Sequence, residues 1–202
     1  FDHLVVALGS ATSDFGIPGV SEYALGMKSV TEALTIRAEV MRRFEDLCRF
    51  KDDTTFNVTV VGGGPTGVEM AGALAELKRG LLKSDEPNAA ANIRVRIIEA
   101  SSRLLPPFAE SLSARTKKDL EKLEVEVLLN SAVKKVEHRK IELSDGKIID
   151  SEITIWAAGV TGSPAITKLN LPTERGRIKV EKTLHVSNYP YIWAIGDNAG
   201  AI

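Results

Sequence analysis

The stretch FNVTVVGGGPTGVEMAGALAEL, residues 56–77, decides the fold of this chain. Its first part is rich in β-branched residues without a helical period, which predicts a buried strand. A glycine-rich segment, residues 62–67, follows, and then a run of Ala, Leu and Glu that favours a helix. A Gly-x-Gly-x-x-Gly pattern placed between a strand and a helix is typical of a Rossmann-type dinucleotide-binding turn.

The glycines of this turn have different expected roles. Gly62 permits a tight turn, Gly64 lets the backbone approach a pyrophosphate, and Gly67 lets the helix pack close to the strand. The free N–H groups at the start of the helix then face the phosphates. A glycine-rich turn that binds nothing is the alternative. The predicted phosphate-binding residues are Gly62, Gly63, Gly64, Pro65, Thr66 and Gly67.

A second parallel strand is predicted at IRVRIIEAS, residues 93–101, and it ends at Glu99. Glu99 lies farther from Gly67 than the usual ~20 positions, and the segment 83–92 accounts for the excess as an enlarged connection. A carboxylate at this strand end can accept both hydroxyls of the adenosine ribose and would repel a 2′-phosphate, which favours NAD over NADP. A solvated glutamate is the alternative, and Arg103 nearby could meet a 2′-phosphate.

Composition narrows the remaining choices. The 202 residues are enough for one domain, or for one domain and part of another. The net charge of −1 gives no electrostatic case for binding nucleic acid. Cys48 is a single cysteine and can form no internal disulfide, which favours a reducing, cytoplasmic setting. His3, His138 and His185 lie far apart in the sequence, so no metal site is expected.

The ends of the sequence suggest a piece of a longer protein. The chain begins without Met at Phe1, inside a strand-like pattern over residues 2–9.

Residues 10–23 are rich in turn formers. Ser29 and Glu32 form a predicted capping box for a helix that runs to about Phe50. The polar segment 51–55 then leads into the central strand.

After Glu99, an amphipathic helix is predicted at 108–123 and a third parallel strand at 125–130. Three antiparallel strands are predicted at 132–139, 140–149 and 150–159, with a hairpin at Asp145-Gly146. Two more strands are predicted, at 176–180 and 191–197. The predicted fold is therefore α/β: a Rossmann-like, three-layer nucleotide-binding domain with an inserted antiparallel β-meander.

Three more strand ends carry a family resemblance. They are LVVALGS (4–10), ITIWAAGV (153–160) and YIWAIGDNA (191–199). Together with GGGPTGVEMAG, they make the chain resemble the FAD-dependent pyridine nucleotide-disulfide oxidoreductases. The run 156–160, and IEA followed by LLPPF, are most similar to the type II, or alternative, NADH dehydrogenases. The resemblance covers essentially the whole chain.

The resemblance implies a domain plan, because in that family an NADH domain is inserted into a flavin domain. Residues 54–160 would be the NAD(H)-binding domain. Residues 1–53, with a connecting helix, and residues 161–202 would be partial segments of a split FAD-binding domain. The family's first flavin fingerprint and its C-terminal membrane-binding helices have no counterpart in these residues. We therefore expect the isolated fragment to be inactive.

The resemblance also implies site residues beyond the glycine-rich turn. Ala158 and Gly159 match small residues beside the nicotinamide, and a closely packed strand end is the alternative. Glu69 matches an acidic residue that faces the nicotinamide and flavin, and it is the one candidate catalytic residue. Its alternative role is a favourable first-turn interaction with the helix dipole. The implied FAD contacts are Gly9, Gly196 and Asp197.

The activity implied by the resemblance is hydride transfer from NADH to FAD, with electrons passed on to a quinone. A ferredoxin- or disulfide-type flavin reductase is one alternative, although the absence of C-x-x-C weighs against a thioredoxin-reductase-like enzyme. A non-catalytic NADH-sensing module is another. A homodimer fits the resemblance. Peripheral attachment to the inner face of a membrane is expected only through parts outside this sequence.

Overall fold

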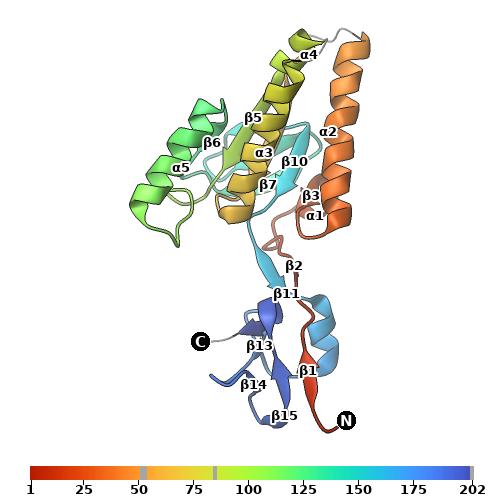
Figure 1. Cartoon of the computed structure of the whole chain (residues 1–202), viewed down its shortest axis with the longest axis vertical. Coiled ribbons are helices and arrows are strands. Elements are labelled where there is room, and N and C mark those ends of the chain that lie inside the picture. Colours follow the sequence, from red (N-terminus) through yellow and green to blue (C-terminus); the bar gives the residue numbers. More distant parts are fainter. Residues whose placement is uncertain (51–53, 84–85, 201–202) are drawn as a thin grey trace. The chain divides into compact units, whose positions relative to one another are not determined.

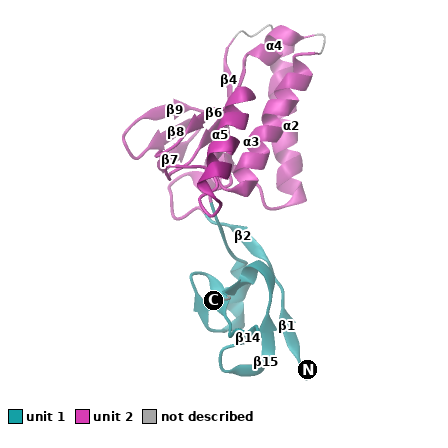
Figure 2. Ribbon diagram, turned by 60° about the vertical axis from the view of Figure 1, so that its left-hand side comes forward, with its two compact units in different colours: residues 1–13, 159–202 teal, residues 14–158 magenta. Residues whose placement is uncertain are grey.

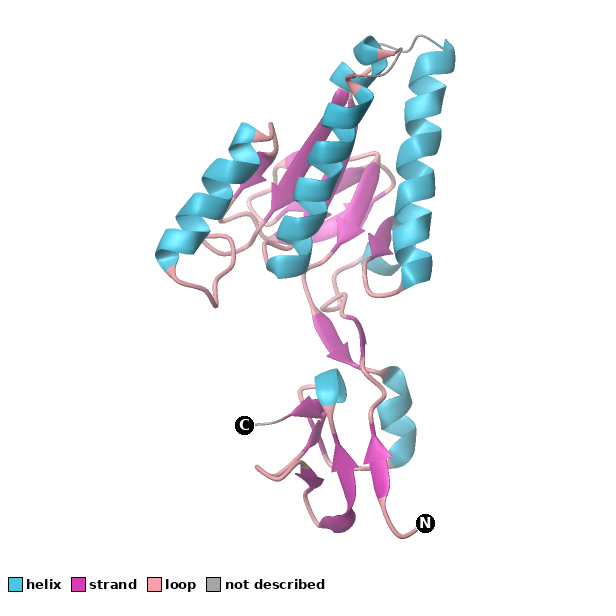
Figure 3. Cartoon of the chain, in the orientation of Figure 1, coloured by secondary structure: helices cyan, strands magenta, loops and turns pink. Residues whose placement is uncertain are grey.

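The computed structural model describes residues 1–50, 54–83 and 86–200, so residues 51–53 of the expected polar connection lie outside it. The chain forms two compact units (Figure 2). One comprises residues 14–158, and the other combines residues 1–13 with residues 159–202. Figure 3 shows that the long helices belong to the first of these units and that short strands dominate the second.

A parallel sheet is the centre of residues 14–158. Among the described residues its strands lie in the order β3 (Ala24–Gly26), β10 (Ile153–Trp156), β4 (Phe56–Val61), β5 (Ile93–Ile98) and β6 (Glu126–Leu128). Chain order therefore runs outward from β4 through β5 to β6, and then returns to β10 on the other side. This reversal beside β4 is the topological switch point at which such sheets bind ligands.

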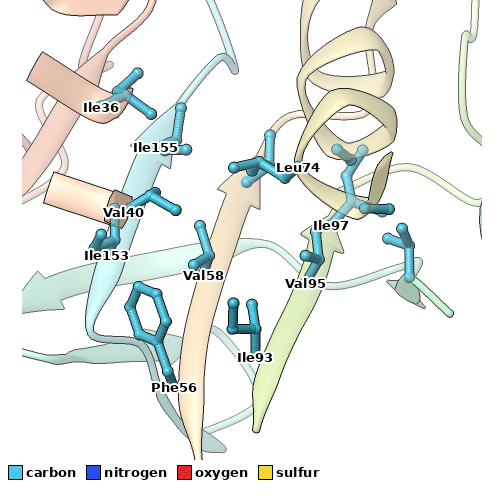
Figure 4. Close-up of a cluster of buried hydrophobic side chains, with 14 of the residues drawn as sticks. Ile36, Val40, Phe56, Val58, Leu74, Ile93, Val95, Ile97, Ile153 and Ile155 are labelled. Atoms are coloured by element: carbon cyan, nitrogen blue, oxygen red, sulfur yellow. The ribbon is translucent and has the colours of Figure 1, made fainter. Parts of the chain in front are cut away.

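Helices cover one face of this sheet. They are α2 (Val30–Phe50), α3 (Pro65–Leu81), α4 (Pro87–Ala91) and α5 (Glu110–Lys122) (Figure 1). Figure 4 shows the core beneath them, where Val40 of α2 and Leu74 of α3 meet Val58 of β4 and Ile155 of β10. The alternate residues of β4 that face this layer are wholly buried, because helices and neighbouring strands enclose them: Phe56, Val58 and Val60.

A β-meander covers the other face. It consists of β7 (Val133–Glu137), β8 (Lys140–Leu143) and β9 (Ile148–Asp150), with α1 (Val20–Tyr23) beside it. Its apolar side chains pack on Val61, Ile98 and Trp156, which are on the sheet face opposite α2 and α3. Helices, parallel sheet and meander thus make three layers, and the predicted Rossmann-like α/β fold is confirmed.

In this unit one expected strand pairs differently, and another strand was not expected. Residues 150–159 were expected to form the third antiparallel strand, but Ile153–Trp156 pairs in parallel with β4. The hairpin predicted at Asp145-Gly146 is confirmed, and it joins β8 to β9. The short strand β3 was missed within a turn-rich region, although it extends the sheet beside β10. Since β3 and α2 both pack on this sheet, they belong to the same compact unit, which begins at residue 14.

The unit of residues 1–13 and 159–202 contains small sheets around its own core. Strands β1 (Leu4–Val6), β15 (Tyr189–Ala194) and β14 (His185–Val186) form one sheet, and β2 (Ser10–Thr12) pairs with β11 (Val160–Gly162). A further sheet joins β12 (Thr173–Glu174), β13 (Arg177–Lys179) and β16 (Ala199–Gly200). Two 3₁₀ helices, η1 (Pro164–Leu169) and η2 (Gly196–Asn198), complete the unit. Val6, Ile178 and Ala194 are among its buried residues.

Candidate dinucleotide-binding site

The carboxyl ends of three adjacent strands meet at one edge of the parallel sheet. Val61 is in register with Ile98 on β5 and with Trp156 on β10. The Gly62 amide donates to the carbonyl oxygen of Ile98 at 2.8 Å, which continues the β4–β5 ladder into the glycine-rich turn. The residues that follow these three strands are therefore brought together, namely Gly62, Glu99 and Ala157.

Two glycines are required by close packing inside this turn. Gly62 has φ +114°, and a Cβ built on it would lie 2.6 Å from the Cα of Ala158. A Cβ on Gly67 would lie 1.9 Å from the carbonyl oxygen of Gly62. Helix α3 can approach the turn so closely only because residue 67 has no side chain.

Gly64 differs from these two glycines. It has an ordinary extended backbone, with φ −73° and ψ −179°, and a Cβ there would meet no atom within 4 Å. Packing of the chain itself therefore does not require glycine at position 64. Open space beside the backbone at the start of a helix suits a phosphate group. No side chain among the described residues caps this helix start, so its N–H groups are available to an anion.

The carboxylate of Glu99 is held by two backbone amides. Oε2 accepts from the Gly63 amide at 2.6 Å, and Oε1 accepts from the Ser101 amide at 2.7 Å. A carboxylate offers about four acceptor positions, so about two remain for hydroxyl groups. Glu99 is half-buried, which leaves it accessible from the carboxyl edge of the sheet.

The guanidinium of Arg103 is occupied by its own loop. Nη1 donates to the carbonyl oxygen of Phe108 at 2.7 Å and to Oγ of Ser113 at 3.0 Å, and Nη2 donates to the carbonyl oxygen of Pro106 at 2.6 Å. The sequence left open a role for Arg103 at a 2′-phosphate. These three bonds aim its guanidinium at the segment 106–113 instead.

A pocket of about 190 Å³ opens at the same edge of the sheet. Gly62, Glu99 and Ala158 line it, together with apolar side chains that include Ile17 and Val133. Its volume is below the ~300–1,000 Å³ of a typical small-molecule site, so it suits one part of a dinucleotide.

Some lining residues were missed by sequence reasoning, and some selected residues lie elsewhere. Residues 131–133 line the pocket because they follow β6, and the predicted third parallel strand was the signal that could have found them.

Pro65, Thr66 and Glu69 are exposed on α3. Glu69 is the fifth residue of that helix, so the expectation of a first-turn position was wrong. It is not among the residues that line the pocket.

The other unit holds the remaining selected residues. Gly9 and Gly196 have φ +66° and +74°, and a Cβ at either would meet nothing within 4 Å. Oδ2 of Asp197 accepts from Oγ of Ser10 at 2.6 Å. Gly159 also belongs to this unit, where its carbonyl oxygen accepts from the Ser13 amide at 3.0 Å.

Asn198 was not selected from the sequence, yet it joins these parts. Its side chain is wholly buried, accepts from the Gly9 amide at 3.1 Å and donates to the carbonyl oxygen of Val6 at 3.1 Å. It therefore ties η2 to the last residue of β1 and to the turn that follows. A polar residue after Gly-Asp gives no signal by itself, because only the fold shows that it is buried.

The described residues offer no support for metal binding or for a membrane-spanning helix. Within residues 1–50, 54–83 and 86–200, no group of three or more His, Cys, Asp and Glu side chains is arranged to hold a metal ion. In the same ranges, no helix has both the length and the apolar character needed to cross a membrane.

Curated proteins resemble this chain over nearly its full length. The type II NADH:quinone oxidoreductase Ndh of Mycobacterium tuberculosis is 36% identical over 213 residues, which covers 98% of this chain and 46% of that protein. A probable mitochondrial NADH-ubiquinone oxidoreductase of Schizosaccharomyces pombe is 32% identical, with 98% and 39% covered. The chain thus spans less than half the length of these relatives.

A solved structure is also similar to this chain over nearly its full length. The structure of NDH2 from Plasmodium falciparum in complex with NADH superposes with a TM-score of 0.88 at 31% identity, covering 98% of this chain and 44% of that one. The sequence model of one family, described as pyridine nucleotide-disulphide oxidoreductase, matches residues 1–202. This match, with the glycine-rich turn and the parallel sheet around it, shows that the chain belongs to the pyridine nucleotide-disulphide oxidoreductase family.

Proposed function

We propose that residues 54–160 bind NADH, and that the chain is part of an FAD-dependent NADH:quinone oxidoreductase. Support comes from the family match and from relatives named as NADH:quinone oxidoreductases. The similar NDH2 structure contains NADH. The chain's own support is the glycine-rich turn, with Glu99 held beside it.

One observation carries the proposal. The acceptor positions left on Glu99 and the open space beside Gly64 lie at the ends of neighbouring parallel strands, joined by the hydrogen bond from Gly63. A dinucleotide needs these two features close together, since its pyrophosphate is attached to the adenosine ribose. In the proposed complex, the two ribose hydroxyls donate to Glu99 and the pyrophosphate lies against Gly64. The pocket beside Ala158 and Val133 takes an apolar part of the ligand.

The residues proposed for FAD also fit a cofactor that approaches the backbone closely. Gly9 and Gly196 have no neighbouring atoms where a Cβ would stand, and both adopt a positive φ that favours glycine. Asp197 adds a carboxylate at the start of η2. We propose that these three residues contact FAD in the complete protein. We assign residues 1–53 and 161–202 to its FAD-binding domain, with residues 54–160 as the NAD(H)-binding domain.

When both cofactors are bound, the chemistry supplied is hydride transfer from NADH to FAD, followed by electron transfer to quinone. The role of this chain's residues in that process is to bind and orient. Glu99 and the glycine-rich turn fix the adenosine end of the dinucleotide. Ala158 and Gly159, which have small side chains or none, leave room for the nicotinamide ring. Glu69 remains a candidate at the reacting end.

The test is calorimetric titration of the 202-residue chain with NADH, NADPH and ADP-ribose. We expect NADH to bind with a dissociation constant of about tens of micromolar to millimolar, roughly −4 to −6 kcal/mol. ADP-ribose should bind nearly as well, since adenosine and pyrophosphate supply most of the proposed contacts. No binding of NADH or ADP-ribose by the folded chain would refute the proposed site.

The complete protein separates the proposed enzyme from a non-catalytic NADH sensor. We expect it to bind FAD, which gives a visible flavin spectrum, and to oxidise NADH when a short-chain quinone is added. A complete protein that binds NADH but takes up no flavin would be a sensor. One that oxidises NADH only with a ferredoxin or a disulfide substrate would be a reductase of that class.

A further inference from the structure

The segment after Glu99 folds back onto the glycine-rich turn. The Leu105 amide donates to the carbonyl oxygen of Gly63 at 2.8 Å. The side chain of Leu104 is buried, and a Cβ on Gly63 would lie 2.8 Å from its Cδ2. Gly63 is therefore held from two sides, by Glu99 at its N–H and by Leu105 at its C=O.

Leu105 adopts an unfavourable backbone conformation to make this contact. Its φ is +51°, in the left-handed region where a leucine is uncommon. Such a conformation persists when surrounding contacts impose it, and ligand-binding segments are among its usual locations. The contacts that impose it should therefore come from the segment around Leu105.

Arg103 supplies several of those contacts, beside the hydrogen bond that the Phe108 amide donates to the carbonyl oxygen of Leu105 at 2.9 Å. Its guanidinium bonds to the carbonyl oxygens of Pro106 and Phe108, which lie on the far side of Leu105 in the chain. A third bond, to Oγ of the buried Ser113, joins the segment to the first turns of α5. Its own carbonyl oxygen accepts from Oγ of Ser101 at 2.9 Å. The planar, permanently charged guanidinium suits several fixed acceptors at once, whereas a lysine ammonium presents a single point of charge.

We propose that Arg103 is a positioning residue for the dinucleotide. It fixes the segment 103–108, whose Leu105 amide holds Gly63 in place, and Gly63 in turn orients the carboxylate of Glu99. Arg103 itself makes no contact with the ligand, and its guanidinium is turned away from a 2′-phosphate. The inference rests on the proposed function, since the dinucleotide is the ligand whose site is positioned.

The test compares Arg103→Ala and Arg103→Lys with the matched control Arg115→Ala. Arg115 is 80% exposed and pairs with Asp119 of its own helix at 3.5 Å. We expect the dissociation constant for NADH to rise about tenfold in Arg103→Ala, equivalent to ~1.4 kcal/mol. The rise should be smaller in Arg103→Lys and absent in Arg115→Ala. Equal affinities in all three variants would overturn the inference.

Two further measurements separate positioning from a general loss of stability. Amide hydrogen exchange should accelerate at Gly63 and Leu105 in Arg103→Lys, while amides in the core of β4 stay protected. In a double-mutant cycle, Arg103→Ala should weaken NADH binding much less when Glu99 is already Ala, because both act through Gly63. Full additivity, or unchanged exchange at both amides, would count against the proposal.

The wild-type chain distinguishes this inference from the proposed function. If wild-type protein binds no NADH, the proposed function fails. The exchange experiment still decides whether Arg103 holds Gly63, since it requires no ligand. If wild-type protein binds NADH and Arg103→Ala binds it equally well, only the positioning role fails.

Discussion

The carboxylate of Glu99 accepts a hydrogen bond from the amide of Gly63, with 2.6 Å between Oε2 and N. The two residues follow different strands, β5 and β4, which are adjacent and in register. The sequence indicates a separate role for each, Glu99 as a ribose acceptor and Gly63 as part of a phosphate-binding turn. In the structure the two residues are hydrogen-bonded to each other, so a substitution of either should weaken the binding of both the ribose and the pyrophosphate.

The first prediction concerns nucleotide preference. NADH should bind more tightly than NADPH, because a 2′-phosphate would meet the negative charge of Glu99. Glu99→Ala should weaken NADH binding by about 1.5–3 kcal/mol, the range for hydrogen bonds to a charged group. It should also narrow the difference in affinity between NADH and NADPH. Calorimetric titration of wild type and variant with both nucleotides measures this.

Glu126→Ala is the matched control for that prediction. Glu126 is also a glutamate of the parallel sheet, but it begins β6 and pairs with Arg96 at 2.7 Å, away from the carboxyl edge. Its loss should leave NADH affinity unchanged. Tighter binding of NADPH than of NADH by the wild type would show that Glu99 does not select the nucleotide.

The second prediction is that Gly64→Val abolishes dinucleotide binding without unfolding the chain. Valine can adopt the extended backbone of residue 64, and its Cβ meets no protein atom within 4 Å. Its side chain would instead fill the space proposed for the pyrophosphate. Thermal unfolding and NADH titration of the same sample provide the measurement. Retained affinity at unchanged stability would mean that the turn binds no phosphate.

Two other glycines of α3 give the third prediction, which concerns stability. Gly67→Ala should lower the melting temperature, since its Cβ would lie 1.9 Å from the carbonyl oxygen of Gly62 and the backbone must shift. Overpacking of this kind costs about 1–3 kcal/mol. Gly72 lies on the same helix with open space around it, so Gly72→Ala should instead stabilise by about 0.5–1 kcal/mol. Equal melting temperatures for the two variants would disprove the close approach at residue 67.

The fourth prediction is a pH dependence at the start of α2. Burial alone would raise the pKa of Glu32, but hydrogen bonds from the Lys28 amide and from the Ser29 amide and hydroxyl outweigh it and lower the pKa. A lowered carboxyl pKa stabilises the folded chain above the unfolded value, about 4.3. That contribution is lost as the pH falls through the lower folded value.

Urea denaturation of wild type and Glu32→Gln between pH 7 and pH 2.5 tests this fourth prediction. The stability difference should be present at pH 7 and should shrink below about pH 4.3. Glu39→Gln is the control, since Glu39 lies farther along α2, where it pairs with Arg42. A difference for Glu32→Gln that grows as the pH falls would contradict the assigned direction.

The strand–turn–helix at residues 56–81 could be predicted because local propensity and tertiary role agree there. The capping box at Ser29 and Glu32 is likewise local, and the structure contains it. Strand β10 is predicted as part of the meander because the sequence of an apolar strand after a hairpin does not indicate which strand it pairs with. Its parallel pairing with β4 depends on the whole sheet.

Other features were beyond the sequence because they depend on distant partners. A three-residue strand such as β3 is too short for a periodic signal. The bonds of Arg103 span Leu105, whose positive φ no local pattern indicated. Asn198 becomes important only because its side chain is buried against a segment at the opposite end of the sequence.

The last prediction follows from that burial of Asn198. Asn198→Ala should destabilise the unit of residues 1–13 and 159–202, because the Gly9 amide loses the oxygen that now accepts from it, while the Val6 carbonyl keeps the bond from the Ile195 amide. Loss of a typical intramolecular hydrogen bond costs about 0.5–1.5 kcal/mol. Amide exchange should therefore accelerate at β1 and β15, while β4 and β5 keep the protection of the separate core to which they belong. Asn88→Ala, at an exposed position on α4, is the control and should change neither set of amides. Unchanged exchange at β1 in Asn198→Ala would show that the buried amide does not hold this unit together.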